Sequence, residues 1–370
     1  MTWREWADAE GRGIRAADRW REPRAFDAAG PEGKLAPDDR PVVSYASNDY
    51  LGLTQHADVV RAAHAALDRW GAGAGSARLI VGSRPVHAEL EAALADWKEA
   101  ERAVVFPTGF ATNLGVVTTF GGPGVVVCSD ELNHASIIDG CRLSRSRVEV
   151  YRHRDLDHLR ALLESATGER RVVVTDTVFS MDGDVAPVEP LAELCARHSA
   201  LLVLDEAHAV LGPEPDLGGL DDLDVLRVGT LSKTLGALGG FVAGPAALTE
   251  LVVNRARSYI FTTAPSPADA AAALAAVGVV RSPEGTALRA RLRDHVERLR
   301  SGHPSPIVPV VLGDEARTLA AAAALLEQGM LVPAIRPPTV APGTSRLRVA
   351  LSAAHTSAQV DALKVALAEL

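Results

Sequence analysis

Cysteine is scarce in the 370-residue sequence, and no hydrophobic run is long. The three cysteines, Cys128, Cys141 and Cys195, have no C-x-x-C spacing and lie in or near apolar segments. We therefore expect reduced, packed thiols and neither a disulfide nor a metal site. No apolar run approaches the roughly 20 residues of a membrane span, and residues 1–6 lack the apolar core of a secretory signal. These absences predict a cytoplasmic protein with no membrane partner.

Positive charge is also in short supply. The sequence has 38 Lys and Arg against 47 Asp and Glu, and its net charge of -9 argues against a general nucleic-acid binder. Arginines do cluster within residues 12–24 and 142–147. Either cluster could bind an anionic ligand, although a solvated helix face is the more common explanation. The length allows two or three domains of ordinary globular composition.

Lysine is rarer still, because it occurs only at positions 34, 98, 233 and 364. Lys233 lies in the segment TLSKTLG (230–236), between apolar runs at 225–229 and 241–243 that both predict strands. A desolvated lysine amine can form a Schiff base, which arginine cannot, and the flanking hydroxyls could hold a phosphate. This segment alone leaves open the alternative of a surface lysine in a polar turn.

Short Val- and Leu-rich strands alternate with amphipathic helices through the middle of the chain. We expect strands at 103–106, 125–128, 148–151, 172–176 and 201–205, and helices after Thr108, after residues 133–136, and at 155–164 and 188–198. Strands that are apolar throughout are buried on both faces. The pattern therefore predicts an α/β fold with a mostly parallel sheet covered by helices on both sides.

The two ends of the chain predict smaller units. Residues 3–21 predict a helix anchored by Trp3, Trp6 and Trp20 and ended by Pro23, followed by a polar stretch and a strand at 42–45. A glycine-rich loop at 71–78 separates helices expected at 57–70, where Val59, Val60, Ala63 and Leu67 share one side, and at 85–99. Helices are expected at 266–300, 315–328 and 357–369, and strands at 307–312, 331–335 and 346–351. We predict an N-terminal helical segment (1–45), a large domain (46–265) and a small C-terminal α/β domain (266–370).

Several polar residues lie where parallel strands end. Ligands of parallel sheets bind beyond the C-terminal strand ends, and Thr108, His134, Ser180 and His208 all follow such ends. Asp205 ends an apolar strand, where a carboxylate is costly without a cation partner. A protonated pyridine nitrogen would be such a partner, and a helix N-cap is the alternative.

The C-terminal strand carries a candidate carboxylate site. Arg346 and Arg348 alternate with Leu347, Val349 and Leu351, so both arginines face one way and the apolar side chains face a core. A guanidinium suits a substrate carboxylate. A structural salt bridge is the alternative for either arginine, and we favour it for Arg346.

Taken together, these motifs resemble the α-oxoamine synthases, which depend on pyridoxal phosphate and have the aspartate-aminotransferase fold (type I). The resemblance runs nearly end to end through NDYLGL (48–53), TGFATN (108–113), NHAS (133–136), FSMDGD (179–184), DEAH (205–208), TLSK (230–233) and IRPPTV (335–340). The family's glycine loop more often ends Gly-Ser-Arg, whereas this chain has Ser76-Ala77-Arg78, which keeps small residues. The last motif points to the branch that condenses L-alanine with pimeloyl-CoA or pimeloyl-acyl carrier protein to 8-amino-7-oxononanoate. The alternative within the family joins glycine to acetyl-CoA.

The resemblance also implies roles for individual residues. It implies that the cofactor is pyridoxal 5'-phosphate, with Lys233, His134 and Asp205 as catalytic residues. Cofactor binding is expected from Gly109, Phe110, His134, Ser180, Asp205, His208, Thr230, Ser232 and Lys233, with Thr262 or Thr263 reaching the phosphate from the second subunit of a homodimer. Substrate binding is expected from Arg21, Asn48, His134, Arg336, Thr339 and Arg348.

Overall fold

A seven-stranded sheet forms the centre of the computed structural model, which describes residues 1–17, 19–212, 214–220 and 222–370. Its strand order is β4-β10-β9-β8-β7-β5-β6. The strands are β4 (Arg102–Phe106), β5 (Val125–Asp130), β6 (Arg147–Tyr151), β7 (Arg170–Asp176), β8 (Leu201–Asp205), β9 (Val225–Thr230) and β10 (Gly240–Gly244). Only the pairs that involve β10 are antiparallel. The prediction of a mostly parallel sheet is therefore confirmed.

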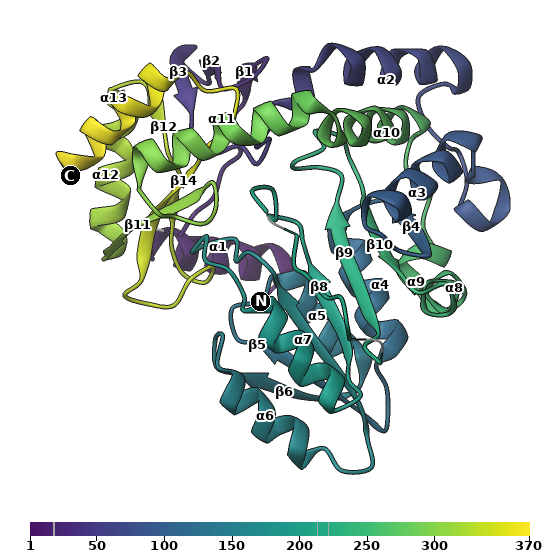
Figure 1. Ribbon diagram of the computed structural model, residues 1–370. Coiled ribbons are helices and arrows are strands. Elements are labelled where there is room, and N and C mark those ends of the chain that lie inside the picture. The colour runs from purple at the N-terminus through teal and green to yellow at the C-terminus, as the bar shows by residue number, and fades with distance from the viewer. Residues whose placement is uncertain (18, 213, 221) are drawn as a thin grey trace.

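Helices cover both faces of this sheet, as Figure 1 shows. One face packs against α4 (Gly109–Phe120), α5 (Ala135–Ser144), α8 (Ala246–Arg255) and α9 (Arg257–Ile260). The other packs against α6 (Leu156–Ser165) and α7 (Val188–Arg197). Successive strand residues alternate between the two cores: Val172 and Val174 face α4 and α5, whereas Val173 faces α6 and α7. The three cysteines are free and buried, which confirms the expectation of packed thiols.

Two smaller sheets join the N-terminal and C-terminal parts of the chain. The first has the order β1-β2-β3-β12 and contains β1 (Phe26–Ala28), β2 (Glu32–Leu35), β3 (Arg40–Ser44) and β12 (Met330–Leu331). The second has the order β11-β14-β13 and contains β11 (Ile307–Gly313), β13 (Ala334–Ile335) and β14 (Ser345–Ala350). The pairing of β12 with β3 places the purple N-terminal strands beside the C-terminal region (Figure 1). The domain division at residues 45 and 265 stays a prediction.

Apart from the N-terminal helix, which is described below, the other helices pack around these sheets. They are α2 (Ala57–Trp70), α3 (Pro85–Trp97), α10 (Pro267–Arg281), α11 (Pro283–Leu299), α12 (Glu315–Glu327) and α13 (Ser357–Ala368), with short helical turns at Leu53–Gln55 and Arg78–Gly82. In α2 the buried side chains are Val59 and Ala66, whereas Val60 and Leu67 are exposed, so the expected apolar face was only partly right. Within the described residues, no helix is long and apolar enough to cross a membrane.

Three other sequence expectations were wrong in detail. The N-terminal helix α1 (Trp3–Ala16) ends well before Pro23 and buries no residue, so its tryptophans are not anchors to a core within this chain. The stretch before Arg40 contains β1 and β2, which lack a strong apolar alternation and were therefore missed. The expected strand at 331–335 is two short strands in different sheets. They are separated at Val332 and Pro333, and proline has no N–H to donate to a strand ladder.

Of the four lysines, Lys98 is buried in an ion-pair network at the end of α3. Its Nζ lies 2.8 Å from Glu206 Oε2 and 3.0 Å from Glu214 Oε1, and its side chain is 3% exposed. Arg227 Nε lies 2.5 Å from Glu206 Oε1, so this glutamate pairs with two cations. Lys98 therefore has a structural partner and is held away from solvent.

We expect Lys98→Met to lower the free energy of unfolding by about 3 kcal/mol, because it leaves a buried carboxylate with one cation instead of two. Chemical denaturation followed by circular dichroism measures this loss. Lys34→Met on the exposed strand β2 is the matched control, and we expect it to be nearly neutral. Equal stabilities of the two variants would contradict the structural role of Lys98.

Candidate active site

Lys233 lies in the connection between β9 and β10 and points at a histidine. Its Nζ is 2.8 Å from His208 Nε2, and His208 Nδ1 is 2.6 Å from the Tyr50 hydroxyl. Burial lowers the pKa of Lys233, although the nearby carboxylates of Asp205 and Asp176 oppose this shift. Burial and the Lys233 charge hold the pKa of His208 well below its usual range. The alternative of a surface lysine in a polar turn is wrong, because this amine is partly desolvated and held by a neutral imidazole.

Two buried carboxylates end the adjacent strands β7 and β8 at the same level. Asp176 and Asp205 are register partners and are 2% and 4% exposed. Asp205 accepts hydrogen bonds from Asn113 Nδ2 at 2.6 Å and from the Ala207 N–H at 2.9 Å, whereas Asp176 accepts from the His134 N–H at 2.8 Å. Burial and the neighbouring Asp205 raise the pKa of Asp176 well above its usual range. Neither carboxylate forms a salt bridge within the part of the chain that the structure describes.

The helix N-cap alternative for Asp205 is wrong, because a turn rather than a helix follows this residue. Asn113 and Asp176 are site residues to which the sequence reasoning gave no role. Asn113 is 2% exposed on α4, and its Nδ2 donates to both Asp205 and Ser136. A signal for Asn113 was present, since a buried amide on an otherwise apolar helix requires a partner. Asp176 ends its strand just as Asp205 does, which was the equivalent signal.

The start of α4 and the end of β9 form a small cradle. Thr108 caps α4, so the first N–H groups of the helix, including those of Gly109 and Phe110, have no carbonyl partner within the helix. A Cβ on Gly109 would lie 3.3 Å from Thr230 Cβ, so only glycine allows this close approach without adjustment. The Thr230 and Ser232 hydroxyls are 2.6 Å apart. Unpaired N–H groups beside two hydroxyls are suited to an anion such as phosphate.

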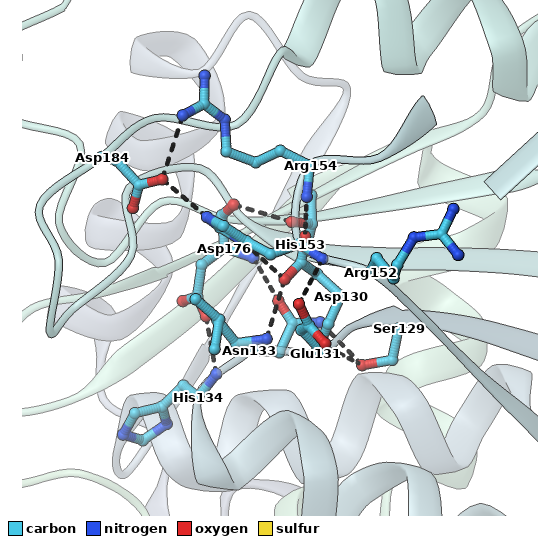
Figure 2. Close-up of polar contacts among 12 residues, drawn as sticks. Ser129, Asp130, Glu131, Asn133, His134, Arg152, His153, Arg154, Asp176 and Asp184 are labelled. Carbon is cyan, nitrogen blue, oxygen red and sulfur yellow. Dashed lines mark hydrogen bonds and ion pairs between the residues drawn. The ribbon is translucent and has the colours of Figure 1, made fainter. Parts of the chain in front are cut away.

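His134 and Ser180 lie beside this cluster on two different loops. His134 is the N-cap of α5, and its Nδ1 is 2.8 Å from Ser136 Oγ, so this histidine acts as a helix cap. Its backbone N–H donates to the Asp176 carboxylate (Figure 2), and its exposed imidazole lies close enough to Asp205 and Lys233 to interact with their charges. Ser180 belongs to a hairpin of residues 178–185, which is closed by a single antiparallel bridge between Val178 and Val185.

Arg348 and Asn48 form the candidate carboxylate site. Arg348 is 6% exposed; its Nε donates to the Ser180 carbonyl at 2.5 Å and its Nη2 donates to Asn48 Oδ1 at 3.1 Å. No carboxylate pairs with Arg348 among the described residues. Arg346, by contrast, forms a salt bridge with Asp182, which confirms that it is structural. The alternation of the two arginines with core residues is confirmed as well.

The other expected ligand residues lie on the periphery. Arg336 follows β13, whose Ile335 is paired with Arg346 on the strand that carries Arg348, and the Thr339 N–H donates to the Arg336 carbonyl at 3.0 Å. Arg21 is exposed after α1. Thr262 and Thr263 lie next to the glycine-rich loop, because the Ala264 N–H donates to the Ser76 carbonyl. No contact within the described residues joins Arg21 or Thr263 to the Lys233 cluster.

The fold and the site can be compared with known proteins. Residues 40–367 match the family model for aminotransferase class I and II. The 8-amino-7-oxononanoate synthase of Anaeromyxobacter dehalogenans (strain 2CP-1) is 50% identical, and the match covers 98% of this chain and 95% of that protein. The homologous synthase of Alkalilimnicola ehrlichii is 46% identical over 96% of this chain and 95% of its own length. The chain therefore belongs to the aminotransferase class I and II family and, within it, to the 8-amino-7-oxononanoate synthases.

A solved structure shares this fold closely. Serine palmitoyltransferase from S. paucimobilis, which contains a bound PLP–myriocin aldimine, has a TM-score of 0.89 at 29% identity, and the match covers 98% of this chain and 95% of that one. This similarity confirms the expected type I fold.

The Asn113–Asp205 bond yields a testable prediction. Asn113→Leu keeps the approximate volume but removes the donor to a buried carboxylate, so we expect the free energy of unfolding to fall by about 1.5–3 kcal/mol. Urea denaturation measures this change. Asn254→Leu is the control, because the Asn254 amide reaches only the Glu250 carbonyl on an exposed part of α8. If both variants lose the same stability, Asn113 does not specifically support Asp205.

Proposed function

We propose that the chain is a pyridoxal-phosphate-dependent acyltransferase that condenses L-alanine with a pimeloyl thioester. The products are 8-amino-7-oxononanoate, CO2 and the free thiol carrier, and the reaction is a step of biotin biosynthesis. The names of relatives that are 44–50% identical over nearly the whole chain support this function. The structural observation that carries it is the Lys233 amine, which is held by a neutral His208 near two unpaired buried carboxylates.

The residues of the site fit pyridoxal 5'-phosphate. Neither buried carboxylate forms a salt bridge among the described residues, and a protonated pyridine nitrogen facing Asp205 would supply a cation partner. The N–H groups of Gly109 and Phe110 and the hydroxyls of Thr230 and Ser232 would bind the phosphate. When bound, the cofactor supplies an electron sink for carbanion chemistry at the amino-acid Cα.

Other residues would orient the ring. The exposed His134 imidazole would stack on one face of the pyridine. Ser180 and His208 would hydrogen-bond its phenolic oxygen, and the Tyr50 hydroxyl already holds His208 from the other side. Asn113 fixes the Asp205 carboxylate through its 2.6 Å hydrogen bond. Each ring position would thus have its own protein partner.

Lys233 carries the proton chemistry in this proposal. Its lowered pKa favours a neutral Nζ, which can bind the cofactor and then remove the Cα proton of L-alanine. Arg348 and Asn48 would hold the alanine carboxylate, since the buried Arg348 guanidinium has no carboxylate partner among the described residues. The carboxylate would thereby fix the Cα–H bond relative to Lys233.

The acyl substrate requires a second cationic site. A pimeloyl thioester ends in a carboxylate, and we propose that Arg21 and Arg336, with Thr339, bind it. In the alternative reaction, glycine with acetyl-CoA, the acyl group has no such carboxylate. Whether the thioester is carried on coenzyme A or on acyl carrier protein is left open, and the cytoplasmic location stays a prediction.

We also propose a homodimer with shared sites. The turn Arg78–Gly82 exposes Leu79, Ile80 and Val81 at 50%, 73% and 68%, and Phe261 is 69% exposed beside Thr262 and Thr263. An apolar surface of this kind marks a protein interface. Burial of this surface against a second copy would place Thr263 near the phosphate of the partner site.

The cofactor linkage is the first test. Borohydride reduction of the holoenzyme, followed by peptide mapping, should find the cofactor on Lys233, because only this lysine combines a lowered pKa with a place in the polar cluster. Lys233→Arg keeps the charge and should give no reducible adduct. Attachment to Lys34, Lys98 or Lys364 would contradict the assignment.

Acyl selectivity is the second test. Arg21→Ala or Arg336→Ala removes a charge-assisted bond, so kcat/KM for the pimeloyl thioester should fall roughly ten- to hundredfold. An uncharged thioester of similar length serves as control substrate and should be affected much less. L-alanine should still perturb the cofactor absorbance. Weakened L-alanine binding with unchanged acyl preference would instead assign these arginines to the amino acid.

A further inference from the structure

His153 follows β6 and lies between two carboxylates, as Figure 2 shows. Its Nδ1 is 2.9 Å from Asp130 Oδ1, and its Nε2 is 2.7 Å from Asp184 Oδ2. Both ring nitrogens therefore face carboxylate oxygens, which are hydrogen-bond acceptors. Such an imidazole satisfies both contacts only when both nitrogens carry protons, which is the imidazolium form. The ring also packs edge-on against Phe179, with centroids 4.4 Å apart.

Asp130 connects His153 to the turn that carries His134. This carboxylate ends β5, accepts from the Leu132 N–H at 2.9 Å and is 3% exposed. The turn continues through Asn133, whose Nδ2 donates to the Val174 carbonyl at 2.8 Å and whose Oδ1 accepts from the Asp176 N–H at 2.9 Å. One side of His153 is thus bonded to the loop that presents His134 to the proposed cofactor site.

Asp184 connects His153 to the hairpin of residues 178–185. The Phe179 N–H donates to the Asp184 carbonyl at 3.0 Å, and the Gly183 N–H donates to the Phe179 carbonyl at 2.8 Å, so Asp184 lies at the closed base of this turn. The tip of the same hairpin provides the Ser180 carbonyl that accepts from Arg348. A Cβ on Gly183 would lie 1.9 Å from the Ile307 carbonyl, which shows how closely the hairpin packs on β11.

We propose that His153 is a positioning residue that locks the 178–185 hairpin to the His134 turn and so fixes Arg348 for the amino-acid carboxylate. The inference rests on the proposed function, because it assigns Arg348 to the L-alanine carboxylate. Among the described residues, the contacts of His153 are with the two carboxylates, Glu131 and Phe179, and none is with Lys233 or Arg348. Its effect passes from Asp184 through the Ser180 carbonyl to Arg348.

The charges around His153 favour the doubly bonded form. Burial by itself would lower its pKa, but the carboxylates of Asp130 and Asp184 outweigh burial and raise the pKa to about 9. The other charged or titratable groups nearby are Glu131, which accepts from the His153 N–H, Arg154, which lies 3.3 Å from Asp184, and His303 next to Gly183. Because folding raises this pKa, the stabilisation that the contact contributes is fully present below pH about 6.5, and it is lost as the pH rises through about 9 and the imidazolium loses its proton.

The test compares His153→Asn with the wild-type holoenzyme near neutral pH. Asparagine can still reach towards Asp130 but is too short to bond Asp184. We expect the dissociation constant for L-alanine, measured by titration of the cofactor absorbance, to rise about threefold to tenfold. The affinity for pyridoxal phosphate should stay within about twofold, since the phosphate cradle and Lys233 are untouched. His158→Asn is the control, because the His158 imidazole accepts from the Arg152 N–H and forms no hydrogen bond with the hairpin among the described residues.

Two further measurements separate positioning from a general loss of stability. Asp184→Asn removes the negative charge of the acceptor in the same contact, and adding it to His153→Asn should raise the L-alanine dissociation constant no further. Above pH about 9 the wild type and His153→Asn should bind L-alanine with similar dissociation constants, because the His153 imidazole of the wild type is then neutral. The amino group of L-alanine also titrates in this range, but its effect cancels when the dissociation constant of His153→Asn is divided by that of the wild type at the same pH.

The outcomes distinguish this inference from the function on which it rests. A wild-type holoenzyme that does not respond to L-alanine would overturn both. A normal wild-type response, together with unchanged L-alanine affinity in His153→Asn and Asp184→Asn, would overturn the positioning role alone. Equal losses of L-alanine and cofactor affinity in both variants would also overturn it, since they would show a general structural role.

Discussion

Two carboxylates at the same level of adjacent parallel strands dominate the electrostatics of this protein. Asp176 and Asp205 are buried side by side, and burial together with the charge of Asp205 raises the pKa of Asp176. Such a pair is stable only with donors and a cation nearby. Asn113 and the His134 N–H supply donors, and the lack of a salt-bridge partner among the described residues favours a bound pyridinium.

The same cluster explains why a lysine is useful at position 233. An amine near two carboxylates would ordinarily keep its proton, yet burial shifts the pKa of Lys233 downward. His208 is held neutral by burial and is fixed by the Tyr50 hydroxyl, so it can bond the amine without adding a positive charge. Lysine is rare in this chain, and Lys98 shows the contrasting case of a lysine paired permanently with glutamates.

The hairpin of residues 178–185 connects the central sheet with the C-terminal sheet. Arg346 and Arg348 reach its tip from β14, whereas His153 holds its base from β6. The proposed amino-acid site therefore depends on segments that are far apart in sequence. A change at the base of the hairpin can alter the position of Arg348 although no atom of the site itself is replaced.

The sequence by itself determined the alternating strands and helices, the mostly parallel sheet and most of the polar residues at its C-terminal edge. Burial on both faces and the 2- and 3.6-residue periods are local properties that the order of the residues records. It could not determine the pairing of β3 with β12, the partners of Asn113 and Asp176, or the two carboxylates on His153. Those depend on which distant segments meet, and whether a polar side chain is a solvated cap or a buried partner is decided only by what packs against it.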